Sequence, residues 1–403
     1  MSLFNPISCL LNYDHSNSKP AYESQQKALF VFGASLFDPG NDQYLNLSVA
    51  AMNWPYGETF FRHPTGRFSD GRLVPDFIAN FAKLPMLPPY LQSGPHVLTD
   101  GANFASAGSG VLVETRPGTL SFPKQLSYFK KATKLLEQQL GHVETKSLLK
   151  RSVYLINMGT NDYSTFYNTN PNATESHRQE FVATVIGNMT SVLQELYNLG
   201  GRKIAFQNVG PLGCRPADKQ GYPQADGGCV EGLSALARLH NKALANILKN
   251  LESQKPGFKY SIFEYYDAID DRVNNPSKYG FYNSTDACCG TGAYRGSNCG
   301  GKNGTETYEL CSNPGDYVWF DGVHTTERGK YENKAARKEE QPSPPQWLKI
   351  NVDGAFCAAT DIGGTGVGEG PVGELERQRT QVALESDALQ FVQATGSLRG
   401  GSS

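Results

Sequence analysis

Two short segments, far apart in the chain, carry the residues with the clearest potential for chemistry. Ser35 follows the apolar run 28–33 (ALFVFG), so its hydroxyl is expected at the carboxyl end of a strand. Asp321 stands three residues before His324, across a glycine turn. An acid in this position can hold the imidazole in one tautomer, and the imidazole can then take the serine proton. The combination predicts nucleophilic catalysis, although a helix-capping serine and a surface turn are the plainer interpretations.

Two further segments have the composition needed to stabilise a developing negative charge. Residues 103–110 (NFASAGSG) are small, which lets backbone N–H groups approach a ligand closely, as an oxyanion hole requires. Asn161 follows the strand-like run 153–159, where its amide can donate a hydrogen bond into a cleft. A tight loop and an Asx-turn are the alternatives. No other His or Cys stands at ligand spacing beside Asp321 and His324, so a metal site there is less well supported.

The elements that must position these residues alternate between short apolar runs and longer amphipathic segments. The runs are apolar on both faces, as buried parallel strands are. The predicted strands cover residues 28–33, 153–159, 203–210 and 260–266. The predicted helices cover residues 76–82, 122–140, 177–199 and 230–251. This alternation predicts a doubly wound α/β sandwich, in which ligands bind at the carboxyl ends of the strands.

The composition of the 403-residue chain is that of a soluble globular protein with one large domain or two ordinary ones. Its 37 basic and 39 acidic residues nearly balance, so charge gives no argument for a nucleic-acid partner. No apolar run approaches the roughly 20 residues that a membrane-spanning helix needs.

Cysteines and glycosylation motifs favour the secretory pathway. Six of the eight cysteines lie between Cys214 and Cys311, and the adjacent pair Cys288 and Cys289 does not have the spacing of a zinc knuckle. Disulfides are therefore the favoured interpretation, and Cys214 and Cys229, which flank a short loop, are expected to pair. The connectivity of the other four stays open. The N-x-S/T sequons are at Asn46, Asn172, Asn188, Asn283 and Asn303.

The N-terminal segment, residues 1–26, argues against this localisation. It lacks a basic start, and Asn5 and Pro6 interrupt its apolar stretch, so it is a poor signal peptide.

Taken in chain order, four blocks resemble the plant GDSL esterase/lipase family of SGNH hydrolases, and within it the lipase-1-like subgroup. The blocks are FGASLFDPGN, NFASAGSG, INMGTNDY and DGVHTTERG. The intervening PTGRFSDGR, PLGCRPA, ACCGTG and YELCSNP segments are also similar to that family. The resemblance covers about residues 27–330 and implies a three-layer α/β/α sandwich with a mainly parallel sheet, the flavodoxin-like SGNH hydrolase fold.

Residue by residue, the resemblance implies a catalytic set of Ser35 as nucleophile, His324 as general base and Asp321 as the acid that orients it. The oxyanion hole is expected from the backbone N–H of Ser35 together with Gly108 and Asn161. No cofactor and no metal are implied. The substrate is then a lipid or small-molecule carboxylic ester, and the alternatives are an acyltransferase that passes the acyl group to an alcohol, or a secreted pseudoenzyme with weakened activity.

The chain departs from the family pattern in two places. The family has Asp where this chain has Ala34, and a carboxylate there can accept backbone N–H groups and brace the nucleophile turn. After His324 the family continues into a helix with an apolar face, whereas residues 330–340 here are mostly charged, so weak support for the His324 loop is expected. His240 is expected to be structural.

The C-terminal part resembles a different family. Residues 331–346 are charged and then proline-rich, which predicts a linker. Residues 347–403 resemble pieces of a plant retroelement-type RNase H-like domain, with Asp353 and Asp387 at motifs that hold magnesium in that family. The stretch between these two residues is too short for the elements that should intervene. We therefore expect a degenerate, disordered tail without nuclease activity and without a nucleic-acid partner.

Overall fold

The computed structural model describes residues 28–45, 47–94, 97–301 and 307–330. The predictions made for the N-terminal segment 1–26, the linker 331–346 and the tail 347–403 therefore concern residues outside the described ranges.

Five parallel strands form the central sheet, in the order β2-β1-β3-β4-β5. They are β1 (Leu29–Gly33), β2 (Gly101–Asn103), β3 (Val153–Asn157), β4 (Lys203–Gln207) and β5 (Lys259–Phe263). The four predicted runs correspond to β1, β3, β4 and β5. The edge strand β2 was not predicted, because its three residues contain no apolar run that could reveal it.

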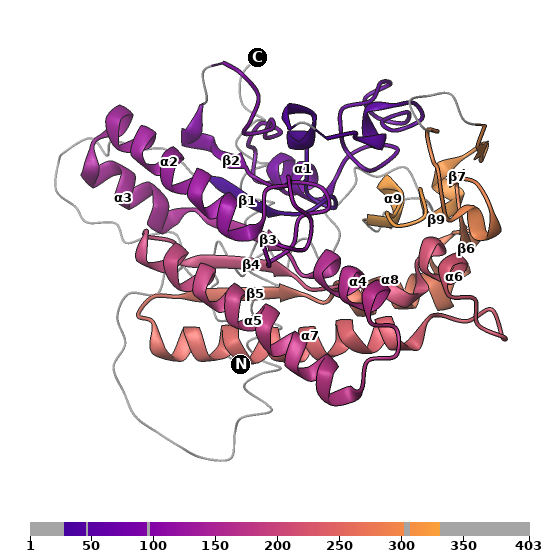
Figure 1. Cartoon of the computed structure of the whole chain (residues 1–403). Coiled ribbons are helices and arrows are strands. Elements are labelled where there is room, and N and C mark those ends of the chain that lie inside the picture. The colour runs from indigo at the N-terminus through magenta and orange to yellow at the C-terminus, as the bar shows by residue number, and fades with distance from the viewer. Residues whose placement is uncertain (1–27, 46, 95–96, 302–306, 331–403) are drawn as a thin grey trace, which may run out of the picture.

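Helices cover both faces of the sheet and make the three-layer α/β/α sandwich that was predicted (Figure 1). Both faces of the sheet are covered because alternate residues of β1 point to opposite faces and are apolar. Phe30 and Phe32 pack with one set of helices, and Leu29 and Val31 pack with another. The first face carries α2 (Phe122–Leu140), α3 (His142–Arg151), α5 (Glu175–Asn198) and α7 (Glu231–Gln254). The second carries α1 (Val74–Phe81).

The strand order places the topological switch point between β1 and β3. The chain moves outward in opposite directions from these neighbouring strands, which opens a crevice at their carboxyl ends. Ser35 follows β1, and Asn161 lies in the first turn of α4 (Thr160–Thr169), which follows β3. The topology alone therefore places two of the predicted site residues at the same edge of the sheet.

A region of short elements flanks this crevice (Figure 1). It contains α6 (Pro216–Gly221), α8 (Tyr265–Asn274), α9 (Glu327–Lys330) and two small sheets, β6 (Asn283–Ala287) with β9 (Tyr317–Trp319) and β7 (Cys289–Gly290) with β8 (Glu309–Leu310). The expected pairing of Cys214 with Cys229 is confirmed. The remaining cysteines of the cluster pair as Cys288–Cys311 and Cys289–Cys299. Among the described helices, none is both long and apolar enough to span a bilayer.

Candidate active site

The structure brings Ser35, His324 and Asp321 into one hydrogen-bonded chain. The Ser35 Oγ lies 2.7 Å from His324 Nε2. The other ring nitrogen, Nδ1, lies 2.8 Å from Asp321 Oδ2 and 2.9 Å from Oδ1. Ser35 is half-buried, whereas His324 and Asp321 are each 6% exposed. The hydroxyl is thus the member of the chain that a substrate can reach, with the base and the acid behind it.

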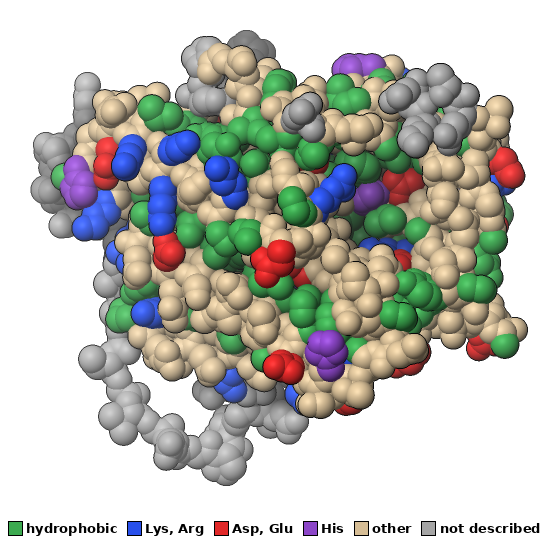
Figure 2. Space-filling view, in the orientation of Figure 1, with side chains coloured by type: hydrophobic (Ala, Val, Ile, Leu, Met, Phe, Trp, Pro, Cys, Tyr) green, Lys and Arg blue, Asp and Glu red, His purple; other side chains and the backbone are tan. Residues whose placement is uncertain are grey.

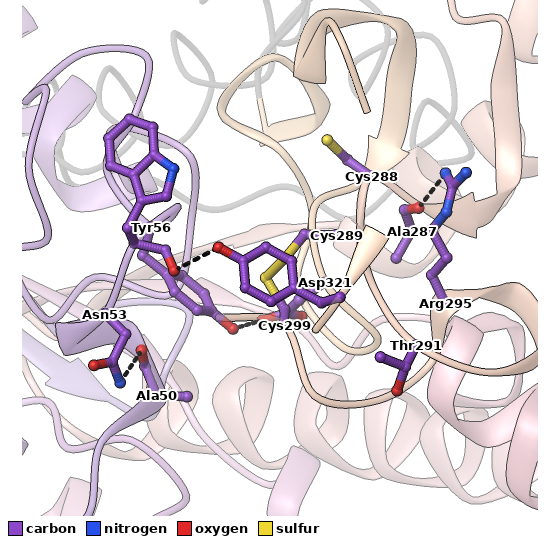
Figure 3. Close-up of a disulfide and its surroundings, with 12 residues drawn as sticks. Ala50, Asn53, Tyr56, Ala287, Cys288, Cys289, Thr291, Arg295, Cys299 and Asp321 are labelled. Carbon is purple, nitrogen blue, oxygen red and sulfur yellow. Dashed lines mark hydrogen bonds between the residues drawn. A yellow bond between two sulfur atoms is a disulfide. The ribbon is translucent and has the colours of Figure 1, made fainter. Parts of the chain in front are cut away.

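Asp321 is surrounded by donors that hold it as a carboxylate. Burial on its own raises its pKa, but the neighbouring His324 and the backbone N–H groups of Val323 and His324 outweigh this, so the pKa falls below its ordinary value. Tyr56 adds a hydrogen bond from its hydroxyl to Oδ2, at 2.8 Å. Figure 3 shows this contact beside the Cys289–Cys299 disulfide, which lies in the same buried cluster as Tyr56.

The turn that carries Ser35 is fastened on the strand side. Both Phe37 and Asp38 donate their N–H groups to the Ala34 carbonyl, at 3.0 Å. Before the turn, Gln125 of α2 holds both backbone groups of Gly33, accepting from N–H at 2.9 Å and donating to the carbonyl at 2.8 Å. The turn is therefore held in place although Ala34 has no side-chain carboxylate.

The two expected oxyanion segments meet next to this turn. Ser106 donates its N–H to the Gly33 carbonyl at 3.0 Å, which fixes the 103–110 loop against the end of β1. Asn161 donates one amide N–H to the carbonyl of Ser109 at 2.8 Å. Gly108 has a φ of +77°, a conformation that suits glycine, and a Cβ there would lie 2.3 Å from Arg116 Nη1.

A pocket opens from the Ser35 hydroxyl. Its lining includes Ser35, Asn161 and His324, but not Gly108. Apolar side chains make up much of the remaining wall; these are Leu36, Pro211, Leu212, Ile269, Trp319 and Val323. Figure 2 shows a hollow right of centre whose floor combines histidine, hydrophobic and Lys or Arg side chains. Such a wall suits the hydrocarbon part of a substrate.

Behind the oxyanion loop lies a buried pair of carboxylates that sequence analysis did not single out. Asp38 accepts the N–H groups of Gly40, Asn41 and Ala107, and Asp42 accepts the Ala107 N–H and the Ser106 hydroxyl. Burial, and then the charge of Asp42, raise the pKa of Asp38 to about 8. Asp38 is therefore largely protonated at neutral pH, and the two carboxyl groups connect the two loops through these hydrogen bonds.

The segment after His324 is better supported than the sequence predicted. The His324 carbonyl accepts the Phe320 N–H at 2.7 Å, and Glu327 of α9 forms an ion pair with Arg72 at 2.7 Å. Lys330 is buried and donates to Ser69 Oγ and the Thr325 carbonyl. The prediction of weak support for the His324 loop is therefore wrong for residues up to 330. Hydrogen bonds and an ion pair hold this segment, in place of the apolar helix face that the family pattern has.

Arg67, Asp70 and Arg72, three charged residues of one loop, connect this loop to other parts of the chain. Arg67 forms a buried ion pair with Asp76 at 2.9 Å. Asp70 accepts the N–H of Glu327 at 2.6 Å, which connects this loop to α9.

His240 is structural in this fold, as expected. It is fully buried, burial lowers its pKa to about 3, and its Nδ1 lies 2.7 Å from the Tyr163 hydroxyl. Its ring also packs against Gly159, the residue before α4, where a Cβ would lie 2.9 Å from Cε1. His240 therefore supports the start of the helix that carries Asn161.

Sequence reasoning missed Tyr56, the pair Asp38 and Asp42, and Gln125 as supports of this site. Tyr56 is 265 residues from Asp321, and nothing local to the NWPYG segment signals that contact. The acid pair carried a weak signal, because Asp38 and Asp42 lie four residues apart and directly after the nucleophile segment.

A sequence model described as GDSL-like Lipase/Acylhydrolase matches residues 29–332. The chain belongs to this family. GDSL esterase/lipase 2 of Arabidopsis thaliana is 44% identical over 334 residues, which cover 81% of this chain and 88% of that protein. Inactive GDSL esterase/lipase-like protein 25 of the same plant is 38% identical, over 75% of this chain and 68% of that protein.

A solved structure, a putative GDSL-like lipase from Parabacteroides merdae, aligns with this GDSL family member at a TM-score of 0.36 and 13% identity. The alignment covers 83% of this chain and 97% of that one. The strand order β2-β1-β3-β4-β5 establishes the fold of this chain without that alignment.

Proposed function

We propose that this carboxylic ester hydrolase of the GDSL type works through an acyl-serine intermediate on Ser35. The observation that carries the proposal is the continuous chain from Ser35 Oγ through the His324 ring to Asp321. One relative bears the name of an inactive protein, so family membership alone is not sufficient, and this geometry supports an active site in the present chain.

In the proposed reaction, Ser35 Oγ attacks the ester carbonyl carbon and its proton passes to His324 Nε2. The tetrahedral intermediate collapses, the bond to the alcohol oxygen breaks, and His324 protonates the departing alcohol. Water then attacks the acyl-Ser35 carbonyl with His324 again as base, and the carboxylic acid leaves as Ser35 regains its proton. Asp321, ionised because its pKa is lowered, stabilises the imidazolium formed in both steps.

We assign the oxyanion hole to the backbone N–H groups of Ser35 and Gly108 and the side-chain amide of Asn161. Asn161 has two N–H groups, and its contact with Ser109 uses only one of them. Its place in the pocket lining beside Ser35 supports the assignment. The names of the relatives describe esterases and lipases, and no feature of the pocket favours an alcohol over water as the acyl acceptor.

The test is activity on a panel of short and long acyl esters together with covalent labelling by a fluorophosphonate. Ser35→Ala and His324→Ala should each lower kcat by on the order of 10⁴-fold, since they belong to one proton-transfer unit. Asp321→Asn should lower kcat by a smaller factor than either of these substitutions. Ser127→Ala, at a half-buried serine, and His142→Ala, at an exposed histidine, are matched controls outside the pocket and should keep full activity. Substantial activity in Ser35→Ala would contradict the proposed mechanism.

For localisation we propose an oxidising, secretory compartment. Three disulfides and the exposed sequons at Asn172 and Asn188 support it. Asn283 is half-buried and bonded to Asp286 at 2.9 Å, which makes it a poorer glycosylation acceptor. Peptide mapping without reductant, on protein produced in a secretory host, tests the proposal, and six free thiols would contradict it.

A further inference from the structure

A buried arginine lines the pocket that contains Ser35. Arg215 lines the pocket and is 7% exposed, although most of the surrounding wall is apolar. Burying a guanidinium among apolar side chains is costly unless its N–H groups find acceptors. How Arg215 distributes its donors therefore indicates what else the pocket is built to hold.

Part of the guanidinium is occupied by its own protein. The Nε group donates to Asp218 Oδ2 at 2.5 Å and to the Leu212 carbonyl at 3.2 Å. One Nη2 hydrogen goes to Ser164 Oγ at 2.9 Å. Within the described residues, Nη1 has no hydrogen-bond partner. The edge formed by Nη1 and Nη2 thus retains donors, while the contacts on Nε and Nη2 hold the group in a fixed orientation.

The contact with Ser164 relates this donor edge to the reacting centre. Ser164 and Asn161 are three residues apart on α4, so they lie on the same face of that helix, with Cβ atoms about 5–6 Å apart. Asn161 is the proposed oxyanion donor. A substrate group bound by Arg215 is therefore about one helical turn, or a few covalent bonds, from the scissile carbonyl.

The charges around this end of the pocket favour an anionic group. Burial raises the pKa of Tyr265, another lining residue, but the charges of Arg272 and Arg215 both act to lower it. Asp218 is the acid that opposes them directly, and it contacts Arg215 through Nε rather than across the Nη1–Nη2 edge. The edge that remains matches the two oxygens of a carboxylate.

We infer that Arg215 is a specificity-determining residue and that the preferred substrates are carboxylic esters with a second, anionic carboxylate a few bonds from the scissile carbonyl. The inference rests on the function proposed above. It divides the pocket into an apolar wall, which contacts the hydrocarbon, and one charged end, which selects the substrate.

The experiment compares matched esters on the full-length protein. On the acyl side, p-nitrophenyl hydrogen glutarate is compared with p-nitrophenyl pentanoate, which has the same chain length without the carboxylate. On the alcohol side, the butanoate ester of 4-hydroxybutanoate is compared with butyl butanoate, which has the same chain length without the carboxylate. We expect kcat/KM to be about tenfold or more higher for the anionic member of at least one pair, mainly through KM. The pair that shows the preference identifies the side on which the carboxylate is bound.

Variants distinguish an effect of the Arg215 charge on substrate preference from an effect on folding. Arg215→Met should lower the ratio of kcat/KM for the anionic ester to kcat/KM for the neutral ester to one or below. Arg215→Lys should give an intermediate ratio, because lysine keeps the positive charge but lacks the two parallel N–H donors of a guanidinium. Asp218→Asn should raise the ratio by removing the competing acid. Arg62→Met, at an exposed arginine outside the pocket, is the matched control and should leave the ratio unchanged.

Failure of this inference is distinguishable from failure of the proposed function. A ratio of one or below in both pairs for the wild-type protein overturns the role of Arg215, even where pentanoate is hydrolysed in a Ser35-dependent manner. Where Arg215→Met does not fold, competitive inhibition of the wild type gives the answer. Glutaramate, the monoamide of glutarate, should then inhibit at least about tenfold more strongly than the neutral pentanamide, and equal inhibition overturns the inference.

Discussion

At the scale of single residues, the proposed catalytic chain depends on a tyrosine from a distant loop. Asp321 receives two backbone N–H groups and the His324 ring, and Tyr56 supplies the remaining donor from the other side. Burial first, and then the Asp321 charge, raise the pKa of Tyr56 well above its ordinary value. Tyr56 thus stays a neutral donor across the working pH range, and we regard it as a positioning residue.

Tyr56→Phe should lower kcat about tenfold with little change in KM, because a hydrogen bond to a charged group is lost while the ring packing stays. Steady-state kinetics give kcat and KM separately and so test this prediction. Tyr308→Phe is the matched control, since that hydroxyl donates to the Trp54 carbonyl at 3.1 Å and does not contact Asp321. Equal effects of the two substitutions would show that Tyr56 acts through the fold alone.

Ala34 is the second residue whose effect can be measured. It is 5% exposed and lies at the start of the nucleophile turn, where the N–H of Leu36 makes no hydrogen bond with the described residues. An aspartate at position 34 can accept that N–H in an Asx-turn. Ala34→Asp should therefore raise kcat a few-fold and leave KM nearly unchanged. The matched control is Ala293→Asp, at an exposed alanine outside the pocket. An unchanged or lower kcat would show that the existing contacts already hold the turn.

At the scale of elements, four of the five strands of the central sheet and its long helices could be predicted from the sequence, because each carries its own apolar pattern. The β1 run and the 122–140 segment are examples. The edge strand β2 and the short α4 could not, since Gly101–Asn103 has no apolar run and α4 begins inside a segment rich in polar residues. The residues of the proposed triad stand in blocks that resemble the family, and their assignment as catalytic residues stays a prediction. The Tyr56 and Arg215 contacts could not, because they depend on how distant loops pack.

The join between the nucleophile loop and the oxyanion loop gives an element-scale prediction about pH. The pKa of Asp38 is about 8 in the folded chain, against about 4 when unfolded, so the folded state binds the proton more tightly. This contribution to stability is complete below about pH 4 and is lost as the pH rises through about 8. Burial also raises the pKa of Asp42, which adds to this dependence of stability on pH.

Asp42→Asn should weaken this pH dependence. The amide keeps an acceptor for Ser106 and Ala107 and can donate to Asp38, while the like-charge repulsion disappears. The Tm of the wild type should therefore fall more between pH 5 and pH 8 than that of Asp42→Asn, by several degrees. Thermal unfolding at both values measures it, with Asp226→Asn as an exposed control. Parallel curves for wild type and Asp42→Asn would mean that the pair holds no extra proton.

At the scale of the whole molecule, the site draws on segments from the first strand to the last described helix. Ser35 follows β1, the lining of the pocket reaches His324, and α9 fastens the segment after it through Glu327 and Lys330. The family match ends at nearly the same point, residue 332. We propose that the esterase domain is residues 27–330 and that the linker and tail predicted after it take no part in the reaction.

A chain that ends at Glu340 should therefore keep kcat and KM within about twofold of the full-length values, with the same Tm within about 2 °C. The physical reason is that every partner of His324 and Asp321 named above lies at or before residue 324. The partners of Glu327 and Lys330 of α9 also lie before residue 331. Activity and thermal unfolding of the two chains, side by side, measure this. A chain ending at Thr326 is the informative counterpart, because it removes Glu327 and Lys330 and should lose both stability and activity. If the chain ending at Glu340 loses stability and activity as the chain ending at Thr326 does, residues beyond 340 support the site. The domain then extends past the proposed boundary.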